Sequence, residues 1–395
     1  MLDSRYTPIM VTSRTRHAVA GLDGPLAVLD LDAADRNAES LIRRAGGVPI
    51  RLASKSIRVP ELLKRVLALD GYAGILAFSL PEALELHNDG FTDIVVAYPT
   101  VNKRALASLA GSADALATIT LMIDSVEHIE FLEHAVGNVP LRLCIDIDGS
   151  LRIGSIHIGT RRSPIRIPEQ ALDLLGRIES SPFTTVGLMC YEGQIAGVGN
   201  AGKGAKARAV RGMQGRSAID LTERRTAIVR AVRDRVDLEF VNGGGTGSLE
   251  SSAGEGSLTE VAAGSGIYSP GLFDGYEHFR HEPSLFAAVP VVRRPAPGWV
   301  TVFEGGWIAS GPAGADRLPH IDWPRGLAYS PTEGPGEVQT PLKGKAADTL
   351  NLGDHVFLRH AKAGELLEHF PSVTAVSGGS IVDTWKTYRG RGWRF

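Results

Sequence analysis

The chain has 395 residues, of which 43% are hydrophobic and 22% charged, and its formal net charge is -2 at pH 7. This length suits one large domain with a smaller one, and the near-neutral charge gives no electrostatic reason to expect nucleic acid or an anionic membrane as a partner. The two cysteines, Cys144 and Cys190, are too few for a disulfide scaffold, which favours a reducing cytoplasm.

The N-terminal segment is polar. As far as His17 it has no apolar run long enough for a signal peptide, and no later segment approaches the length of a membrane span. We therefore expect a cytoplasmic protein without a membrane partner. Residues 26–32 then form an apolar, strand-like run, and residues 33–46 follow with a helical pattern.

From Val48 onward, short β-rich runs alternate with segments of helical period. Several of these runs are apolar on both faces, as is typical of parallel strands covered by helices. The runs span residues 48–54, 73–78, 93–99, 117–124, 141–148, 184–191, 237–244 and 259–268. Eight such strands with connecting helices in about 220 residues predict a (β/α)8 TIM barrel of the α/β class, with an open doubly wound sheet as the alternative.

Residues 195–216, after the sixth run, are rich in glycine and basic residues. We expect a loop here, either mobile or folded over the entrance of a site. Beyond Phe286 the segments are β-rich and punctuated by Gly and Pro, with no helical alternation. These patterns predict a barrel over residues 26–285 and a β domain built from residues 286–395 together with residues 1–25.

Polar residues follow the predicted barrel strands at the points where the strands end. They are Lys55, Arg152, Tyr191, residues 242–248 and residues 265–268. The active sites of TIM barrels lie at the C-terminal ends of the strands, so these groups are expected at one rim. That rim is the predicted site of chemistry.

Lys55 follows a strand of apolar or small residues. A lysine that leaves a parallel strand at a barrel mouth is partly desolvated, which favours the neutral amine and imine formation. On position alone, an ordinary surface lysine at a strand end is the better interpretation. Lys55 gains a chemical role only together with the other residues of the rim.

The glycine-rich run Gly243–Ser248 follows the seventh predicted strand. Successive glycines let the backbone approach a ligand, and free N–H groups at a following helix start can bind an anion. A dinucleotide-binding motif belongs after the first strand of a βαβ unit, whereas phosphate binding after strands seven and eight recurs in TIM barrels. We therefore expect phosphate binding here, with a tight structural turn as the alternative.

Arg152 and Tyr191 are the other candidates at the rim. Arg152 could reach a ring hydroxyl or a carboxylate, and it could equally be a surface arginine. Tyr191 could contact a planar cofactor, and it could equally be a strand-end tyrosine with a satisfied hydroxyl.

The order of these motifs resembles that of the fold-type III pyridoxal 5'-phosphate (PLP) enzymes, and within them the D-threonine aldolase and D-serine dehydratase branch, a relative of alanine racemase. The motifs are RLASKS, AGILAFSLPEALELHNDGFTDIVVAYP, IDIDGSLRIG, GLMCYEGQ, VNGGGTGS and EVAAGSGIY, and the resemblance covers nearly the whole chain. The resemblance implies an alanine racemase-like fold, a TIM barrel with a C-terminal β domain, in a homodimer.

By this resemblance Lys55 would carry PLP as a Schiff base. The phosphate would be held by Gly244, Gly245, Thr246, Gly266 and Tyr268. Arg152 would lie near O3' of the cofactor, and Tyr191 beside its ring. PLP accepts electrons as a bond to Cα of an amino acid breaks. The implied function is a PLP-dependent lyase acting on a β-hydroxy D-amino acid, by aldol cleavage or by dehydration and deamination, and a freed Lys55 is the candidate base for the second reaction.

The branch also carries a metal site near the C-terminus, a His followed two residues later by Cys or Asp, which holds the β-hydroxyl of the substrate. Here His360 keeps the first position, but Lys362 stands at the second. A protonated lysine has no lone pair and repels a divalent cation. We therefore expect the metal to be absent or rearranged, with the Lys362 ammonium in its place beside His360 in catalysis. The alternatives are Glu365 or His355 as a replacement ligand, and Lys362 as a plain surface residue.

Two other functions remain open at this point. An amino-acid racemase of the alanine racemase type would need a second base, for which Tyr329 and Tyr388 are available. A PLP-binding protein without turnover is the other, although small barrel proteins of that kind lack a full β domain.

Overall fold

The structure is a computed structural model that describes residues 10–395. The chain forms two compact units. One is a barrel unit, formed by Leu41–Lys55 and Lys64–Gly264 with Phe395. The other, here called the sheet unit, comprises the described chain up to Ser40 together with residues 56–63 and 265–394.

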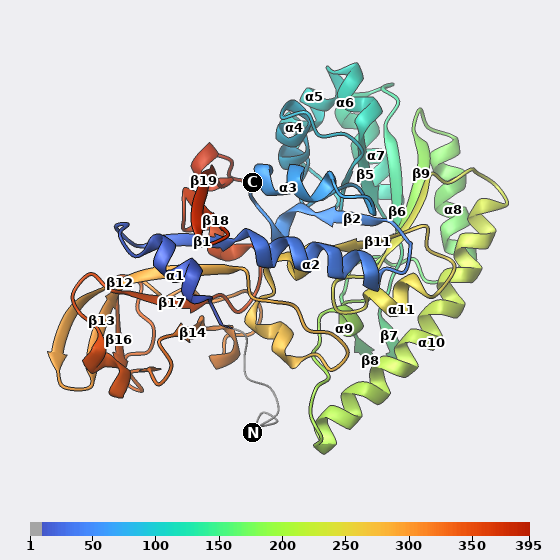
Figure 1. The fold of residues 1–395 in the computed structure, drawn as a ribbon. Coiled ribbons are helices and arrows are strands. Elements are labelled where there is room, and N and C mark those ends of the chain that lie inside the picture. Colours follow the sequence, from blue (N-terminus) through green and yellow to red (C-terminus); the bar gives the residue numbers. More distant parts are fainter. Residues whose placement is uncertain (1–9) are drawn as a thin grey trace. The chain divides into compact units, whose positions relative to one another are not determined.

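Eight parallel strands of the barrel unit close into a barrel in the order β10-β11-β2-β3-β4-β5-β6-β9 (Figure 1). They are β2 (Ile50–Ala53), β3 (Tyr72–Ala77), β4 (Ile94–Val96), β5 (Ile119–Ile123), β6 (Arg142–Asp146), β9 (Thr184–Cys190), β10 (Phe240–Gly243) and β11 (Glu260–Ala263). Each lies inside one of the predicted runs or within one residue of it. The predicted TIM barrel is confirmed, and the open doubly wound sheet is wrong.

The connecting helices begin where the sequence supplies capping groups. Ser79 accepts a hydrogen bond from the Glu82 N–H at the start of α4, and Pro168 opens α8. The helices are α4 (Leu80–Asn88), α5 (Lys103–Ala110), α6 (Ala113–Thr118), α7 (Val126–Val136), α8 (Pro168–Glu179), α9 (Gly193–Ala196), α10 (Ala205–Arg233) and α11 (Leu249–Ala253). Two further helices, α2 (Leu31–Arg44) and α3 (Pro60–Leu67), contribute residues to both units.

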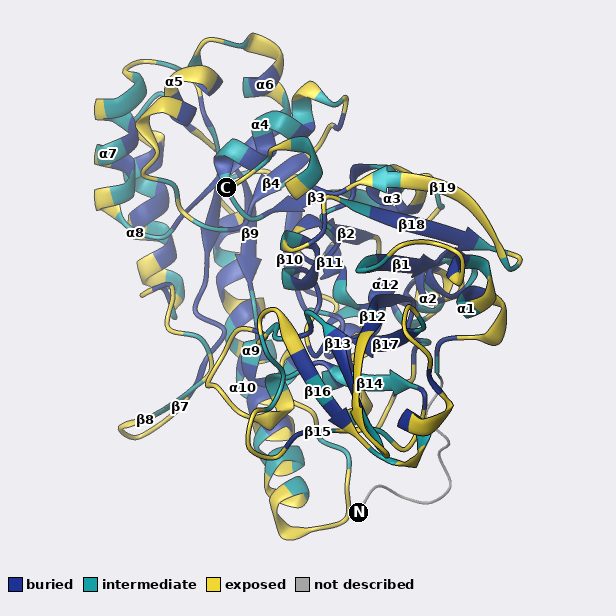
Figure 2. Cartoon of the chain, turned by 90° about the vertical axis from the view of Figure 1, so that its left-hand side faces the viewer, coloured by how far each residue is buried: buried dark blue, intermediate teal, exposed yellow. Residues whose placement is uncertain are grey.

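The interior of the barrel is an apolar cluster to which seven of the eight strands contribute residues. Its buried members are Leu76, Val95, Ala97, Met122, Cys144, Val186, Met189, Phe240 and Ala262. Figure 2 shows the barrel strands buried and the surrounding helices exposed on their outer sides. The same cluster is bordered by Ala53, Tyr98 and Tyr191, which are only partly buried. These three residues stand at or just beyond strand ends and so mark the mouth of the barrel.

Two features of the barrel unit depart from the sequence pattern. A hairpin of β7 (Leu151–Ile153) and β8 (Ile156–Ile158) follows β6, and it is not among the strands predicted from the sequence. The expected loop over residues 195–216 is wrong beyond residue 204, because the long helix α10 begins at Ala205. Alanine, lysine, arginine and glutamine are strong helix formers, and they outweigh the two glycines inside the helical stretch.

The sheet unit is built around a mixed sheet of nine strands. They are β1 (Leu26–Asp30), β12 (Leu285–Ala296), β13 (Trp299–Phe303), β14 (His320–Trp323), β15 (Ala328–Tyr329), β16 (Gln339–Lys343), β17 (His355–Arg359), β18 (Ser372–Ser377) and β19 (Ser380–Lys386). Its helices are α1 (Ser13–Val19) and α12 (Ser265–Tyr268). Short 3-10 turns occupy Gly271–Gly275, Ala315–Arg317, Lys345–Thr349, Glu365–Glu368 and Arg389–Arg391.

The N-terminal strand β1 is central to this sheet, because it pairs antiparallel with β12 and parallel with β18. The assignment of residues 1–25 to the β domain stays a prediction, and residues 1–9 lie outside the described residues. The boundaries at residues 25 and 285 stay predictions.

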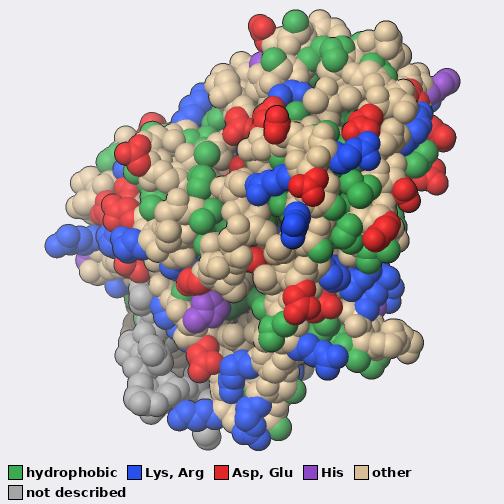
Figure 3. Space-filling view, turned by 90° about the vertical axis from the view of Figure 1, so that its right-hand side faces the viewer, with side chains coloured by type: hydrophobic (Ala, Val, Ile, Leu, Met, Phe, Trp, Pro, Cys, Tyr) green, Lys and Arg blue, Asp and Glu red, His purple; other side chains and the backbone are tan. Residues whose placement is uncertain are grey.

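None of the helices between residues 10 and 395 is long and apolar enough to cross a membrane. On the face drawn in Figure 3, Lys and Arg side chains are interspersed with Asp and Glu, in keeping with the small net charge of -2. Both cysteines, Cys144 and Cys190, are buried and free.

Candidate active site

Lys55 lies in the 3-10 turn Ser54–Ser56, directly after β2. Side chains alternate along a strand, so Arg51, Ala53 and Lys55 belong to one row. Ala53 borders the apolar cluster inside the barrel, so this row faces inward. Lys55 ends the row, exposed to solvent. The structure thus places this lysine at the barrel mouth, where the sequence predicts it.

The Lys55 amine contacts one tyrosine at the barrel mouth, and an arginine joins that tyrosine to a second one. Lys55 Nζ donates a hydrogen bond to Tyr98 Oη over 3.2 Å. The Arg162 guanidinium carbon lies 5.1 Å from the centre of the Tyr98 ring and 5.0 Å from the centre of the Tyr191 ring. One guanidinium therefore contacts the faces of both rings, a favourable cation–π arrangement. Sequence reasoning selected Tyr191 but missed Tyr98 and Arg162.

Asp146 is a buried carboxyl on β6, in register with Met189 of the barrel cluster. Burial raises its pKa to about 7, Arg162 opposes the rise, and the nearby carboxylates of Asp124 and Asp148 add to it. Asp146 is thus poised to hold a proton near neutral pH.

The glycine-rich loop after β10 is held from behind by Glu192. This buried carboxylate accepts hydrogen bonds from the Gly244 N–H over 3.2 Å and from Ser248 Oγ over 2.9 Å, and it accepts a further one from Ser252. The Gly245 N–H donates to Ser248 Oγ over 3.1 Å. A bound phosphate would therefore compete with Glu192 and Ser248 for these two N–H groups.

Arg225 of α10 balances the charge of Glu192. Its side chain is 1% exposed, and Nη2 lies 3.1 Å from Glu192 Oε2, while Nη1 lies 3.3 Å from Glu255 Oε2. A Cβ atom at Gly243 would lie only 2.8 Å from Nη1 of Arg225, so a larger residue does not fit there. Gly244 adopts φ +82°, which a residue with a side chain rarely tolerates. The loop is thus a fixed, closely packed backbone.

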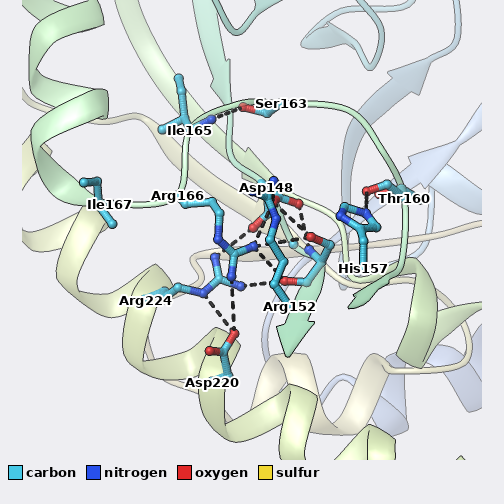
Figure 4. Close-up of polar contacts among 12 residues, drawn as sticks. Asp148, Arg152, His157, Thr160, Ser163, Ile165, Arg166, Ile167, Asp220 and Arg224 are labelled. Atoms are coloured by element: carbon cyan, nitrogen blue, oxygen red, sulfur yellow. Dashed lines mark hydrogen bonds and ion pairs between the residues drawn. The ribbon is translucent and has the colours of Figure 1, made fainter. Parts of the chain in front are cut away.

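Arg152 lies on the β7–β8 hairpin and belongs to a group of three arginines around Asp148 (Figure 4). Arg152 Nη2 and Arg166 Nη1 approach Asp148 Oδ2 at 2.7 and 2.8 Å. Arg224 of α10 donates to the Asp148 carbonyl over 2.9 Å. The Arg152 side chain is 45% exposed. Its role near the cofactor stays a prediction, whereas Arg162 is the arginine found against both mouth tyrosines.

The remaining predicted phosphate residues, Gly266 and Tyr268, lie on α12 of the sheet unit. The Tyr268 side chain is buried, and its hydroxyl donates to the Ile57 carbonyl over 2.8 Å. In the barrel unit Thr246 is buried, and its carbonyl accepts a hydrogen bond from Arg44 over 2.6 Å. Their roles toward a phosphate stay predictions.

His360 follows β17 in the sheet unit and is 4% exposed. Neither of its ring nitrogens has a hydrogen-bond partner among residues 10–395. Its ring meets the Tyr268 ring edge to face, with centroids 6.1 Å apart. Burial lowers the pKa of His360 to about 3, so the imidazole is neutral.

The surroundings of His360 do not supply a second metal ligand. Lys362 Nζ donates to Ser310 Oγ over 2.7 Å, and Glu365 Oε2 accepts from the Ser310 N–H over 2.8 Å. His355 precedes His360 by five residues along an extended strand, a separation of about 16 Å. Within the part of the chain that the structure describes, no three His, Cys, Asp or Glu side chains lie together so as to hold a metal ion. The donor set does not fit a divalent metal.

The comparison with known families decides the identity of the fold. The alanine racemase N-terminal domain family matches residues 29–269. The chain belongs to this family. The predicted fold-type III PLP enzyme of the D-threonine aldolase branch is thereby confirmed at the level of the family and its cofactor.

Individual relatives point to one branch of the alanine racemase-like proteins. A D-threonine aldolase from an Arthrobacter species is 27% identical over 294 residues, which is 73% of each chain. A 3-hydroxy-D-aspartate aldolase from Paracoccus denitrificans is 26% identical over 244 residues, 61% of this chain and 59% of the other.

Solved structures support the fold over nearly the full length. A D-threonine aldolase from Filomicrobium marinum gives a TM-score of 0.78 at 22% identity, covering 95% of this chain and 97% of that one. A D-threo-3-hydroxyaspartate dehydratase from Delftia sp. HT23 gives 0.72 at 21% identity, covering 94% and 98%. The predicted alanine racemase-like fold, a barrel with a β domain, is confirmed.

The residues at the barrel mouth fit PLP. A lysine follows the end of β2 and contacts one phenol, a guanidinium lies against that phenol ring and a second one, and a glycine loop without side chains follows β10. A Cβ atom at Gly245 would lie 2.9 Å from Ala196 Cβ and 3.4 Å from the Tyr191 ring, so only a glycine keeps this surface open beside Tyr191. Aldehyde, aromatic ring and phosphate would each meet suitable groups in the barrel unit.

Proposed function

We propose that the chain is a PLP-dependent lyase that acts on a β-hydroxy D-amino acid by aldol cleavage or by dehydration and deamination. The observation that carries the proposal is the exposed Lys55 at the end of an inward-facing row, with its amine hydrogen-bonded to Tyr98 and with Arg162 against the Tyr98 ring. The names of the relatives supply the substrate class. The substrate is a small amino acid, and nothing in the charge pattern calls for a nucleic acid or a membrane.

PLP, when bound, supplies an electron sink for the breaking of a bond to Cα. Lys55 would hold its aldehyde carbon, Tyr191 and Arg162 would border its ring, and Gly244–Thr246 would face its phosphate. Arg162 adds a fixed positive charge that favours anionic groups of cofactor or substrate. The Lys55 amine, when not bonded to the cofactor, would take a proton from the substrate, and the choice of bond would follow from how the protein orients the substrate.

The racemase interpretation receives less support from the two tyrosines that it needs. The Tyr329 hydroxyl donates to the Pro319 carbonyl over 2.8 Å, and burial raises the pKa of Tyr329. Tyr388 is 1% exposed. Neither is presented as a ready base within the sheet unit.

The test is a screen of D- and L-threonine and of the four 3-hydroxyaspartate stereoisomers. We expect an aldehyde or glyoxylate with glycine from an aldolase, and ammonia with a keto acid from a dehydratase, in either case from D-substrates. The screen is repeated in deuterium oxide with single alanine and serine enantiomers. Deuterated mixtures of enantiomers without carbonyl products or ammonia would show a racemase and overturn the proposal.

We also propose that this chain works without a divalent metal, with the Lys362 ammonium where the branch has its second ligand. Lys362 is held by Ser310, and the His360 imidazole has no partner among the described residues. The Lys362 ammonium, two residues after His360 in the chain, could orient a β-hydroxyl by hydrogen bonding without a metal. A homodimer and a cytoplasmic location complete the proposal by family likeness.

Metal content of the purified enzyme and calorimetric titration with Zn²⁺ and Mn²⁺ test this directly. We expect no stoichiometric metal, and activity that is unchanged by a chelator. Lys362→Asp restores a His-x-Asp pair and should gain binding of either ion, with Lys362→Gln as the uncharged control. Activity that is lost with chelator and regained with manganese or zinc would overturn the metal-free proposal.

A further inference from the structure

Tyr98 is the side chain that meets the Lys55 amine in the barrel unit. It stands two residues beyond the end of β4, and its hydroxyl accepts the hydrogen bond from Lys55 Nζ at 3.2 Å. Its ring packs against the barrel's apolar cluster, which fixes the phenol at the mouth. The two groups come from neighbouring positions around the barrel, separated only by β3. This is a contact between two groups that can each carry a proton.

The charges around Tyr98 favour its ionised form. Burial alone would raise the pKa of Tyr98, but the Lys55 ammonium and the Arg162 guanidinium outweigh it and lower the pKa below its ordinary value. The buried carboxyl of Asp146 on β6 has its own pKa raised to about 7 by burial, so it is about half protonated at that pH. The balance of charge beside Tyr98 is therefore positive.

Tyr191, on the other side of Arg162, is affected in the opposite sense. Burial raises the pKa of Tyr191 to about 12, and Arg162 only partly offsets this rise. The two mouth tyrosines share one arginine, and Tyr98 in addition accepts a hydrogen bond from the lysine. The asymmetry singles out Tyr98 among the phenols of the mouth.

We propose that Tyr98 exchanges a proton with Lys55 and so controls when the Lys55 amine is free to react. The transfer moves one proton from the Lys55 ammonium to the Tyr98 phenolate, leaving an amine with a lone pair and a neutral phenol, and the reverse transfer restores the pair. Arg162 stabilises the phenolate before the transfer, when Lys55 is an ammonium. The inference rests on the proposed use of Lys55 as the cofactor lysine and adds a second catalytic residue to it.

The exchange answers a chemical need of the site. A lysine amine must lose a proton before it can attack a carbonyl carbon or accept a proton from a substrate. At the barrel mouth a phenolate 3.2 Å away can accept that proton without a water molecule in between. Tyr98 would thereby return Lys55 to its neutral, reactive amine after each turnover.

Tyr98→Phe tests the proposal in the full chain, because it removes the hydroxyl and keeps the ring that packs on the barrel. The matched control is Tyr72→Phe, at the start of β3 and so at the other end of the barrel. Thermal unfolding of both variants and their cofactor absorbance establish that fold and cofactor loading are retained. We expect kcat of Tyr98→Phe to fall by about 10²-fold with a much smaller change in KM, and the control to stay unchanged.

Two measurements separate a proton-transfer role from a packing role. The first is the rise of phenolate absorbance with pH in cofactor-free protein, where one of the eight tyrosines should ionise before the others and be missing in Tyr98→Phe. The second is the rate at which an amine-reactive reagent modifies Lys55, measured by mass spectrometry. The phenolate of Tyr98 stabilises the Lys55 ammonium, which does not react with the reagent. Loss of the phenolate should therefore speed this modification several-fold near pH 8.

The outcomes are distinct. An early-ionising tyrosine that disappears in Tyr98→Phe, with altered Lys55 modification and reduced kcat, supports the proposal. Unchanged Lys55 modification together with an unchanged phenolate titration would overturn it, whatever the activity. If wild-type protein fails to bind PLP through Lys55, the proposed function fails, while the lysine modification still reports on the Tyr98 contact by itself.

Discussion

The barrel contains two polar clusters, one at each end of the same strands, and they are built in opposite ways. At the amino ends, Arg51 binds Glu260 through two hydrogen bonds of 2.5 and 2.8 Å. These side chains are almost fully buried, and the charges are matched. At the carboxyl ends, Lys55 and Arg162 meet phenols, and the buried Asp146 has no matched cation of its own.

The difference shows that one row of side chains contains both a structural cation and a reactive cation. Arg51 and Lys55 are four residues apart on the same inward row. A buried ion pair with all hydrogen bonds made is a structural element, because removal of either partner strands a charge. A cation beside a phenol at the open mouth of the barrel is a reactive element, because a proton can move between the two groups at a small cost in free energy. Four predictions test this division.

The largest effect is expected at the mouth. Lys55→Ala should abolish the visible absorbance of the lysine-bound cofactor and reduce turnover by about 10⁴-fold or more, because the attachment point and the base are lost together. Absorbance of the purified variant with added PLP, together with turnover of the preferred substrate, measures both. Retained absorbance would show that another lysine carries the cofactor. Lys64→Ala, on exposed α3, is the control and should behave as wild type.

The opposite end should show the second largest effect, on stability. Glu260→Ala removes the buried carboxylate partner of Arg51 and leaves it only the half-exposed carboxylate of Asp93, and we expect the free energy of unfolding to fall by about 3 kcal/mol. Denaturant unfolding measures the change, and turnover per folded molecule should stay near that of wild type. Glu239→Ala is the matched control, because it breaks the surface pair with Arg142 and should cost no more than about 1 kcal/mol. A loss of turnover without a loss of stability would remove the distinction between the two clusters.

The sequence predicted the barrel because the signal lies in local patterns. All eight strands were visible as apolar runs with turn residues between them, and their ends located Lys55, Tyr191 and the glycine loop. The hairpin β7–β8 was not visible, because its strands have three residues each and are too short to show alternation. The sequence therefore predicted Arg152 as the arginine of the site, and Arg162, which follows that hairpin, was missed.

The rest depends on contacts that no local pattern encodes. Glu192 joins Gly244 and Arg225 across intervals of 52 and 33 residues. Tyr98 could have been found by the rule already used for Tyr191, since it too lies near the end of a predicted strand, the run 93–99. Its selection required knowing that Lys55 and Arg162 are its neighbours, which only the closed barrel reveals.

Arg162 and Arg152 provide the third prediction, which tests which of these two arginines belongs to the cluster at the barrel mouth. Arg162→Ala should reduce kcat/KM by about 10²-fold, because it removes the cation shared by Tyr98 and Tyr191. Arg152→Ala should change it by no more than about 3-fold, because that side chain is half exposed and Asp148 keeps Arg166 as a partner. Steady-state kinetics of both variants at one pH measure the contrast. A larger loss with Arg152→Ala would return the cofactor role to that residue.

The smallest effect concerns Asp146 and pH. Burial raises its pKa to about 7, whereas an aspartate in the unfolded chain titrates near about 4. Between these values the folded protein holds a proton that the unfolded chain has released, so its free energy of unfolding falls as the pH rises. Asp146→Asn imitates the protonated form, and at pH 8 it should unfold with a free energy about 2 kcal/mol above that of wild type.

Asp148→Asn is the control for Asp146→Asn, with the opposite sign. Although burial opposes it, hydrogen bonds from Arg166 and Ser150 lower the pKa of Asp148, so its contribution to stability is present at neutral pH and is lost as the pH falls through the lowered value. Asp148→Asn should therefore destabilise the protein at pH 8, where Asp146→Asn stabilises it. Urea unfolding of both variants between pH 5 and pH 8 compares them. If Asp146→Asn kept the pH dependence of wild type, the mouth carboxyl would be as well matched as Glu260, and the two ends of the barrel would not differ in kind.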